Sequence, residues 1–220
     1  MELVIFHYHL QPGGVTGVIR RMVTGVGRFG KTVDRVRIVV GTEASAEGIP
    51  EDVTVETMPT IGYIARRSLA EYAPVSNSSE SDRPDAGPET TAGPIERVSA
   101  AAVAEGTEVL AARIAAELRA RFGGSECVWW VHNHHLGKNP AFTAALARIV
   151  AEDPDRRIVF HVHDFPECGR YANLRFLREA VVGSLYPRGD GVSYATINSR
   201  DKTILHDAGV SPVRYLPNPV

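Results

Sequence analysis

Three pairs of histidines, each pair separated by one residue, are the part of this sequence best suited to chemistry. They are His7 and His9, His132 and His134, and His161 and His163. An imidazole ring gains or loses its charge near neutral pH, so it can bind a substrate, move a proton or hold a metal ion. Each pair lies at the end of a short apolar run rich in β-branched or aromatic residues, which is typical of a strand. The sequence therefore predicts paired imidazoles at three strand ends.

Short apolar runs alternate with helical patterns along the chain. The predicted strands are 3–8, 35–40, 53–57, 127–131, 157–162, 192–197 and 213–216, and the longest predicted helix runs from about Ile95 to Phe122. Gly123 and Gly124 should stop that helix. This alternation predicts an α/β fold with a doubly wound, mostly parallel, Rossmann-like sheet of about seven strands.

The predicted sheet gives the histidines a common location. Residues two apart in a strand point to the same face, so we expect both rings of each pair to point one way. With the strand order 3-2-1-4-5, the first, fourth and fifth strands are neighbours, and their carboxyl ends border a ligand crevice. Asn133, His135 and Asp164 would add polar groups there. The alternative is that some of these rings are core residues bonded to backbone carbonyls.

Two glycine-rich stretches resemble phosphate-binding patterns. PGGVTG has Pro12 where the dinucleotide pattern G-x-G-x-x-G has its first glycine, but Gly13 and Gly14 still predict a turn into a helix whose N–H groups favour an anion. Residues 25–32 match G-x-x-x-x-G-K-[ST]. A working phosphate loop follows a strand and opens a helix, whereas this one follows a helical pattern and precedes a strand. We interpret it as a helix end and a turn.

Composition narrows the classes of protein and partner. The chain has 220 residues, 44% of them hydrophobic, and 24 Lys+Arg against 26 Asp+Glu, for a formal net charge of -2. This excludes the basic surface typical of nucleic-acid binding. No run is long and apolar enough to suggest a transmembrane segment or a secretion signal. With only two cysteines as well, we expect a cytoplasmic protein with reduced thiols.

One segment differs in composition from the rest. Residues 73–94, APVSNSSESDRPDAGPETTAGP, offer almost nothing to bury and predict a flexible surface insertion. A domain boundary is the competing interpretation, but the preceding part has too few strands for a stable sheet of its own. We therefore expect one domain over 1–216, followed by the start of a linker at 217–220.

The order of these features resembles the N-terminal half of a GT-B glycosyltransferase, most closely the family 4 group. The resemblance rests on HYHLQPGGVTGVIRRM, WWVHNHH, VFHVHDF, YATINSRDKTILHDAGV and RYLPNPV, and it covers almost the whole chain apart from the insertion. In that family the N-terminal domain binds the acceptor, and a C-terminal domain holds the nucleotide-sugar donor.

The resemblance implies roles for particular residues. His163 and Asp164 would be catalytic, His163 beside the transferred sugar. Gly13 and Gly14 would lie near the donor phosphates. Further substrate contacts would come from His9, His132, Asn133, His134, Asn198 and Arg200. No cofactor and no metal are expected, and the nucleotide sugar serves as co-substrate.

The chain departs from the family in lacking the donor-binding domain, so we expect little or no sugar transfer by this part alone. Two other functions fit the same residues. The histidines and Asp164 resemble the ligands of a metal-dependent hydrolase, although such enzymes usually form a (β/α)₈ barrel of about 250 residues. A Rossmann-like module that binds a sugar without turning it over is the other.

Overall fold

Seven parallel strands form one sheet in the computed structural model, which describes residues 1–26, 32–44, 46–74, 98–124 and 126–218. The strands are β1 (Glu2–His7), β2 (Arg35–Val40), β3 (Val53–Thr57), β4 (Cys127–His132), β5 (Ile158–Val162), β6 (Val192–Thr196) and β7 (Val213–Tyr215). Their order is β3-β2-β1-β4-β5-β6-β7, and each neighbouring pair is parallel. The predicted strands, their order and the α/β class are thus confirmed.

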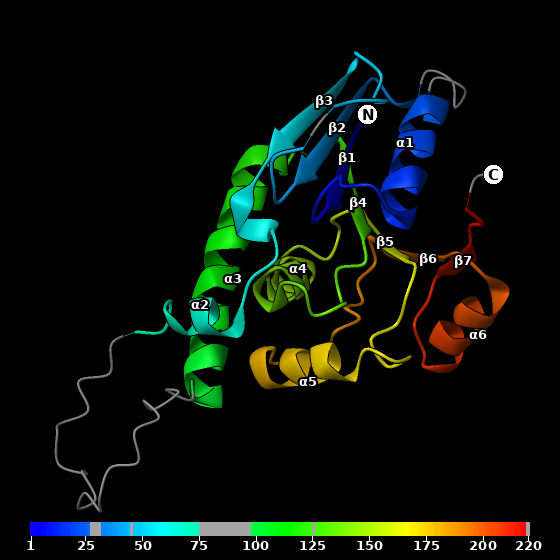
Figure 1. Ribbon diagram of the computed structural model, residues 1–220. Coiled ribbons are helices and arrows are strands. Elements are labelled where there is room, and N and C mark those ends of the chain that lie inside the picture. Colours follow the sequence, from blue (N-terminus) through cyan, green and yellow to red (C-terminus); the bar gives the residue numbers. More distant parts are fainter. Residues whose placement is uncertain (27–31, 45, 75–97, 125, 219–220) are drawn as a thin grey trace, which may run out of the picture.

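Helices cover both faces of this sheet (Figure 1). They are α1 (Gly14–Val26), η2 (Pro59–Ile61), α2 (Arg66–Ala70), α3 (Ala100–Phe122), α4 (Pro140–Glu152), α5 (Tyr171–Ala180) and α6 (Ser199–Asp207). Helix α1 packs on one face through a core that includes Ile5, Ile19 and Ile38. Helices α3, α4 and α5 pack on the other face around Phe6 and Trp129. In the described ranges, no helix combines the length and apolar character needed to cross a membrane.

Helix α3 begins later than the sequence suggests. Val98 and Ser99 precede the helix, and the Ser99 hydroxyl accepts a hydrogen bond from the Ala102 N–H at 3.1 Å. This N-cap satisfies one of the free amides at the helix start and fixes the boundary at Ala100. The expected start near Ile95 is therefore wrong, and 95–97 themselves lie outside the described residues. The predicted stop is confirmed, with Gly123 at the C-cap.

Three predictions fall wholly or partly outside the described residues. The phosphate-loop match at 25–32 includes 27–31, but α1 ends at Val26 and β2 begins at Arg35, which confirms that a helix precedes the match and a strand follows it. The insertion at 73–94 is described only as far as residue 74, and the linker at 217–220 only as far as residue 218.

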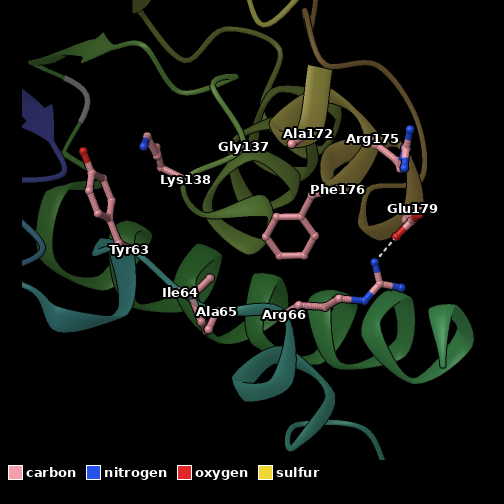
Figure 2. A pocket seen from close by; sticks show the side chains of 10 residues that line it. All are labelled: Tyr63, Ile64, Ala65, Arg66, Gly137, Lys138, Ala172, Arg175, Phe176 and Glu179. Atoms are coloured by element: carbon pink, nitrogen blue, oxygen red, sulfur yellow. Dashed lines mark hydrogen bonds and ion pairs between the residues drawn. The ribbon is translucent and has the colours of Figure 1, made fainter. Parts of the chain in front are cut away.

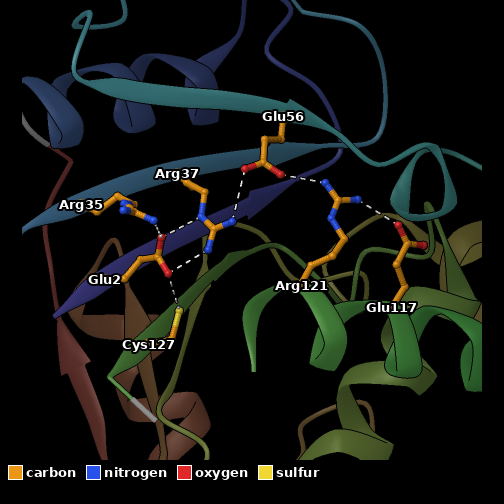
Figure 3. A network of polar contacts seen from close by, with 7 residues as sticks. All are labelled: Glu2, Arg35, Arg37, Glu56, Glu117, Arg121 and Cys127. Carbon is orange, nitrogen blue, oxygen red and sulfur yellow. Dashed lines mark hydrogen bonds and ion pairs between the residues drawn. The ribbon is translucent and has the colours of Figure 1, made fainter. Parts of the chain in front are cut away.

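An ion-pair network fastens the sheet to the end of α3 (Figure 3). Arg37 Nε and Nη2 each donate to the Glu2 carboxylate at 2.8 Å. Glu56 bridges Arg37 to Arg121, which in turn donates to Glu117 at 2.9 Å. The Cys127 thiol donates to Glu2 at 3.6 Å, and burial together with this carboxylate raises the thiol pKa to about 11. We call Glu2, Arg37, Glu56, Glu117 and Arg121 the arginine network.

Candidate functional site

Four imidazole rings meet where β1, β4 and β5 end. The ring centroids of His132 and His161 are 5.0 Å apart, those of His161 and His163 4.2 Å, and those of His7 and His132 6.0 Å. His132 Nδ1 lies 2.9 Å from His163 Nε2, so one ring donates a hydrogen bond to the other. The predicted meeting of the three strand ends is confirmed. We call His7, His132, His161 and His163 the histidine cluster.

The second ring of the middle pair departs from this pattern. Asn133 follows β4 with a φ of 52°, in the left-handed region that asparagine tolerates better than most residues. This turn sends His134 to the opposite face, where its ring packs 4.2 Å from Phe160 and its Nε2 bonds to the Leu185 carbonyl. The expectation that His132 and His134 point the same way is therefore wrong.

Asn133 also ties two strand ends together. Its Oδ1 accepts a hydrogen bond from the His163 N–H at 2.8 Å, and its own N–H donates to the His161 carbonyl at 3.0 Å. The Tyr8 hydroxyl donates toward the carbonyls of Asn133 and His134 at 3.2 and 3.1 Å. These contacts fix the backbone on which His132 and His163 are placed.

Burial keeps the clustered rings uncharged at neutral pH. It lowers the pKa of His7 and of His161 to about 3, and that of His163 to about 4. The pKa of His132 falls well below its usual range, because the ring is buried and has histidines for neighbours. A neutral imidazole offers one N–H donor and one lone pair, so the cluster can either donate or accept.

Three of these rings are also spaced as potential metal ligands. Nitrogens of His132, His161 and His163 lie within 4.8 Å of one another. However, the Trp130 indole N–H donates to His161 Nδ1 at 3.2 Å, so a neutral His161 carries its proton on Nε2 and has no lone pair there for a metal. The sheet is also open, not a closed barrel. The hydrogen bonds therefore favour a neutral polar array over the zinc site of a hydrolase.

A pocket of about 210 Å³ opens beside the cluster, and we call it the glycine-rim pocket. The residues predicted from the sequence that line it are His9, Gly13, Gly14, Asn133 and Asp164. Helix α1 begins at Gly14, so its first N–H groups lie at the rim. No heavy atom lies within 4 Å of the place where a Gly14 side chain would begin, so packing does not require glycine there. Glycine leaves that backbone open to a ligand.

Sequence reasoning missed several residues around this pocket. Tyr63 lies before α2, and its hydroxyl donates to or accepts from His9 Nε2 at 2.9 Å. Lys138 Nζ lies 4.9 Å from the Tyr63 ring centroid. Arg170 pairs with Asp164 at 3.2 Å. The one available signal was Asn139-Pro140, a typical helix start, which places Lys138 in the loop after β4.

A second pocket of about 320 Å³ adjoins the first, and the two share Tyr63 and Lys138 (Figure 2). We call it the basic pocket, because Arg66, Lys138 and Arg175 line it together with the single acid Glu179. The loop that carries Tyr63 is held in place by the Asn139 amide, which donates to the Thr60 and Gly62 carbonyls at 2.9 and 2.7 Å.

Comparison with known proteins adds one relative. No protein-family profile matches the chain. The sequence is 30% identical over 226 residues to the mannosylglucosyl-3-phosphoglycerate synthase of Petrotoga mobilis. The match takes in 100% of this chain but 37% of that protein, so the chain spans little more than a third of its relative's length. This similarity to a glycosyltransferase supports sugar transfer as the general class of chemistry.

The remaining predicted residues lie away from the glycine-rim pocket. His132 and His163 belong to the cluster behind it, with 0% and 8% exposure. Asn198 caps α6, its Oδ1 accepting from the Asp201 N–H at 2.8 Å. Arg200 is exposed in the first turn of the same helix. Both follow β6 at the carboxyl edge of the sheet.

Proposed function

We propose that this chain is the acceptor-binding domain of a GT-B glycosyltransferase that takes a sugar from a nucleotide-sugar donor. The observation that carries the proposal is the glycine-rim pocket, where polar residues from three neighbouring strand ends meet the start of α1. Ligands of open parallel sheets bind at this edge. The 30% sequence identity to a synthase, over the whole of this chain, supports the same class of reaction.

The donor side of the reaction needs an anion-binding surface. As the sugar leaves the nucleoside diphosphate, negative charge grows on the phosphate oxygens, and fixed N–H dipoles stabilise it. Gly13 and Gly14 present the first N–H groups of α1 at the open rim. We propose that they face the diphosphate when a second domain, which holds the donor, closes over this edge. Asn198 and Arg200 lie farther along the edge and are proposed as further substrate contacts.

The acceptor side needs hydrogen bonds and a place for a proton. His9 and Asn133 line the pocket and would bind acceptor hydroxyls, with Asp164 as an additional acceptor of hydrogen bonds. His163 is neutral because burial lowers its pKa to about 4, so the ring can form a hydrogen bond with the acceptor, although the same low pKa makes it a weak base. His132 positions His163 through their shared hydrogen bond, and His134 supports the loop from the other face.

The whole protein's activity extends beyond these residues. Because the chain matches 37% of its relative, we propose that donor binding resides in a further domain, and that this part alone transfers little sugar. The relative's name indicates a product containing phosphoglycerate, and a sugar linked to 3-phosphoglycerate is therefore a candidate acceptor for this chain.

The first experiment compares two glycines of α1. Neither Gly14 nor Gly17 has a heavy atom within 4 Å of an added Cβ, but only Gly14 lines the pocket. With the donor domain present, product formation from nucleotide sugars and candidate acceptors would be followed by mass spectrometry. We expect Gly14→Ala to lower kcat/KM at least about tenfold, as expected for a disturbed anion contact, and Gly17→Ala to change it little. Equal effects of the two changes would contradict the proposal.

The second experiment tests His163 directly. His163→Ala should lower kcat by about tenfold or more, as expected on loss of a hydrogen bond to the reacting group. His206→Ala, on the exposed side of α6, is the matched control and should retain full turnover. Unchanged turnover in His163→Ala would remove this ring from the mechanism.

A further inference from the structure

The basic pocket holds more positive charge than its own residues neutralise. Arg66 pairs with Glu179, the acid of the pocket, and Arg170 at the neighbouring rim pairs with Asp164. Lys138 and Arg175 make no ion pair within the described parts of the chain. Two cations from different elements thus share one pocket without a carboxylate of their own.

Lys138 is held in place in a way that leaves its charge available. Its ammonium group lies 4.9 Å from the Tyr63 ring centroid, within the range of a cation–π contact. Unlike a carboxylate, an aromatic ring does not cancel the charge. The positive charge also acts on its surroundings, because partial burial and then Lys138 lower the pKa of His9. An anionic group of a ligand placed near this ammonium would therefore be stabilised.

The backbone brings Lys138 and α5 together. Gly137 has a φ of 70°, and a side chain there would begin 2.6 Å from the Asn173 carbonyl oxygen. Only glycine permits this approach of the loop after β4 to the helix that carries Arg175. Figure 2 shows Tyr63 and Lys138 on one side of the pocket, Arg66, Arg175 and Glu179 on the other, and the Phe176 ring between them. The pocket therefore offers separated charges with an apolar surface between them.

We propose that the basic pocket binds an anionic group of the acceptor, a phosphate or a carboxylate, through Lys138, which lies at the end of this pocket shared with the glycine-rim pocket. The reacting hydroxyl then lies in the glycine-rim pocket, because Tyr63 and Lys138 line both pockets. The rest of the acceptor extends over Phe176 toward Arg175. This inference rests on the proposed function, since it names the chemical class of the acceptor for that site.

The test measures binding of small anions to the 220-residue chain by NMR titration. The probes are 3-phosphoglycerate, glycerol 3-phosphate and glycerate, and the amide signals of Gly137, Lys138 and Ala172 report the pocket. We expect Lys138→Gln to weaken the best probe about tenfold or more, because it removes a charge-assisted hydrogen bond, and Arg175→Gln, at the opposite end of the pocket, to weaken it less. Arg178→Gln is the control, since it removes the same charge from an exposed position of α5.

The outcomes either identify the type of anion that the pocket binds or overturn the proposal. Binding of glycerol 3-phosphate identifies a phosphate site, and binding of glycerate identifies a carboxylate site. No binding of any probe, or equal losses in all three variants, overturns the proposal. Circular dichroism checks that each variant is folded.

A transfer assay with the donor domain present tests this inference separately from the proposed function on which it rests. If the pocket binds the acceptor's anion, Lys138→Gln should raise the acceptor KM about tenfold and leave kcat within about twofold. Normal transfer with an unchanged KM would reject the anion site and keep the glycosyltransferase. Absence of transfer by the unsubstituted protein, with anion binding intact, would instead reject the glycosyltransferase.

Discussion

The arginine network and the histidine cluster both involve strands of the same sheet, but they differ in how fully their polar atoms are paired. Every glutamate and arginine of the network has a charged partner. In the cluster, His7 Nδ1, His132 Nε2 and His161 Nε2 are buried without a hydrogen-bond partner among the described residues. Buried polar atoms are normally paired, and exceptions concentrate at functional sites. The difference supports the proposal that the cluster binds a ligand, whereas the network stabilises the fold.

The largest expected effect is a loss of stability in mild acid. Unfolded histidines bind protons from about pH 6.5, whereas the folded rings of His7, His135, His161 and His163 resist protonation until about pH 3 or 4. The unfolded state therefore binds more protons between these limits. Stability is complete above about pH 6.5 and should fall by about 1.4 kcal/mol per pH unit for each such ring. Urea unfolding at a series of pH values measures this slope.

Glu2 of the arginine network should contribute nothing to this slope between pH 6.5 and 4.5. Burial raises the pKa of Glu2, but the hydrogen bond and charge of Arg37 outweigh it, so the net pKa lies below the ordinary 4.5. Its stabilising effect is present above pH 4.5 and is lost only in stronger acid. His135→Gln should make the slope shallower by one proton, and His206→Gln should not. A flat profile from pH 6.5 to 4.5 would contradict the neutral cluster.

Breaking the network should have the second largest effect. Arg37→Ala leaves the Glu2 carboxylate partly buried without its main partner and removes the more distant of the two partners of Glu56, so it should lower the free energy of unfolding by about 2–3 kcal/mol. Arg35→Ala is the matched control, because Arg35 is 3.8 Å from the same Glu2 and its side chain is 70% exposed. It should cost less than about 1 kcal/mol. Acceptor binding should be unchanged in both variants. A loss of binding would instead mean that the network also shapes the site.

The smallest expected effect concerns Asn198, which belongs to neither cluster. Its side chain caps α6, and Asn198→Ala should lower the free energy of unfolding by about 1 kcal/mol. Asn198→Ser retains a capping oxygen and should recover most of that loss. If Asn198→Ser keeps its stability but loses transfer activity, the residue also contacts substrate.

Much of the fold could be predicted from the sequence, because the signals are local. Runs such as LVIF and IVF identify buried strands, and the alternation of strands with helices implies the parallel order. The convergence of His7, His132 and His161 follows from that order alone.

The rest of the site depends on contacts that have no sequence period. A single left-handed residue, Asn133, turns His134 away from the other rings, and strand alternation cannot predict such a change of direction. Tyr63 lies in the loop before α2, Lys138 in the loop after β4, and Arg175 in α5. Only tertiary packing brings these three residues together around one pocket. At 25–32 the residues match a phosphate-loop pattern, but a helix precedes them and a strand follows, which is the wrong order for such a loop. Here the flanking elements, and not the pattern itself, predict the structure correctly.

The contact between Cys127 and Glu2 has a practical consequence. It leaves one cysteine buried with a thiol that stays protonated at neutral pH, while the other, Cys168, is exposed four residues beyond Asp164. These 220 residues therefore offer a single attachment point for a maleimide dye. A fluorophore placed there would sit next to the edge where we propose that a donor domain docks, and would report its approach when that domain is added.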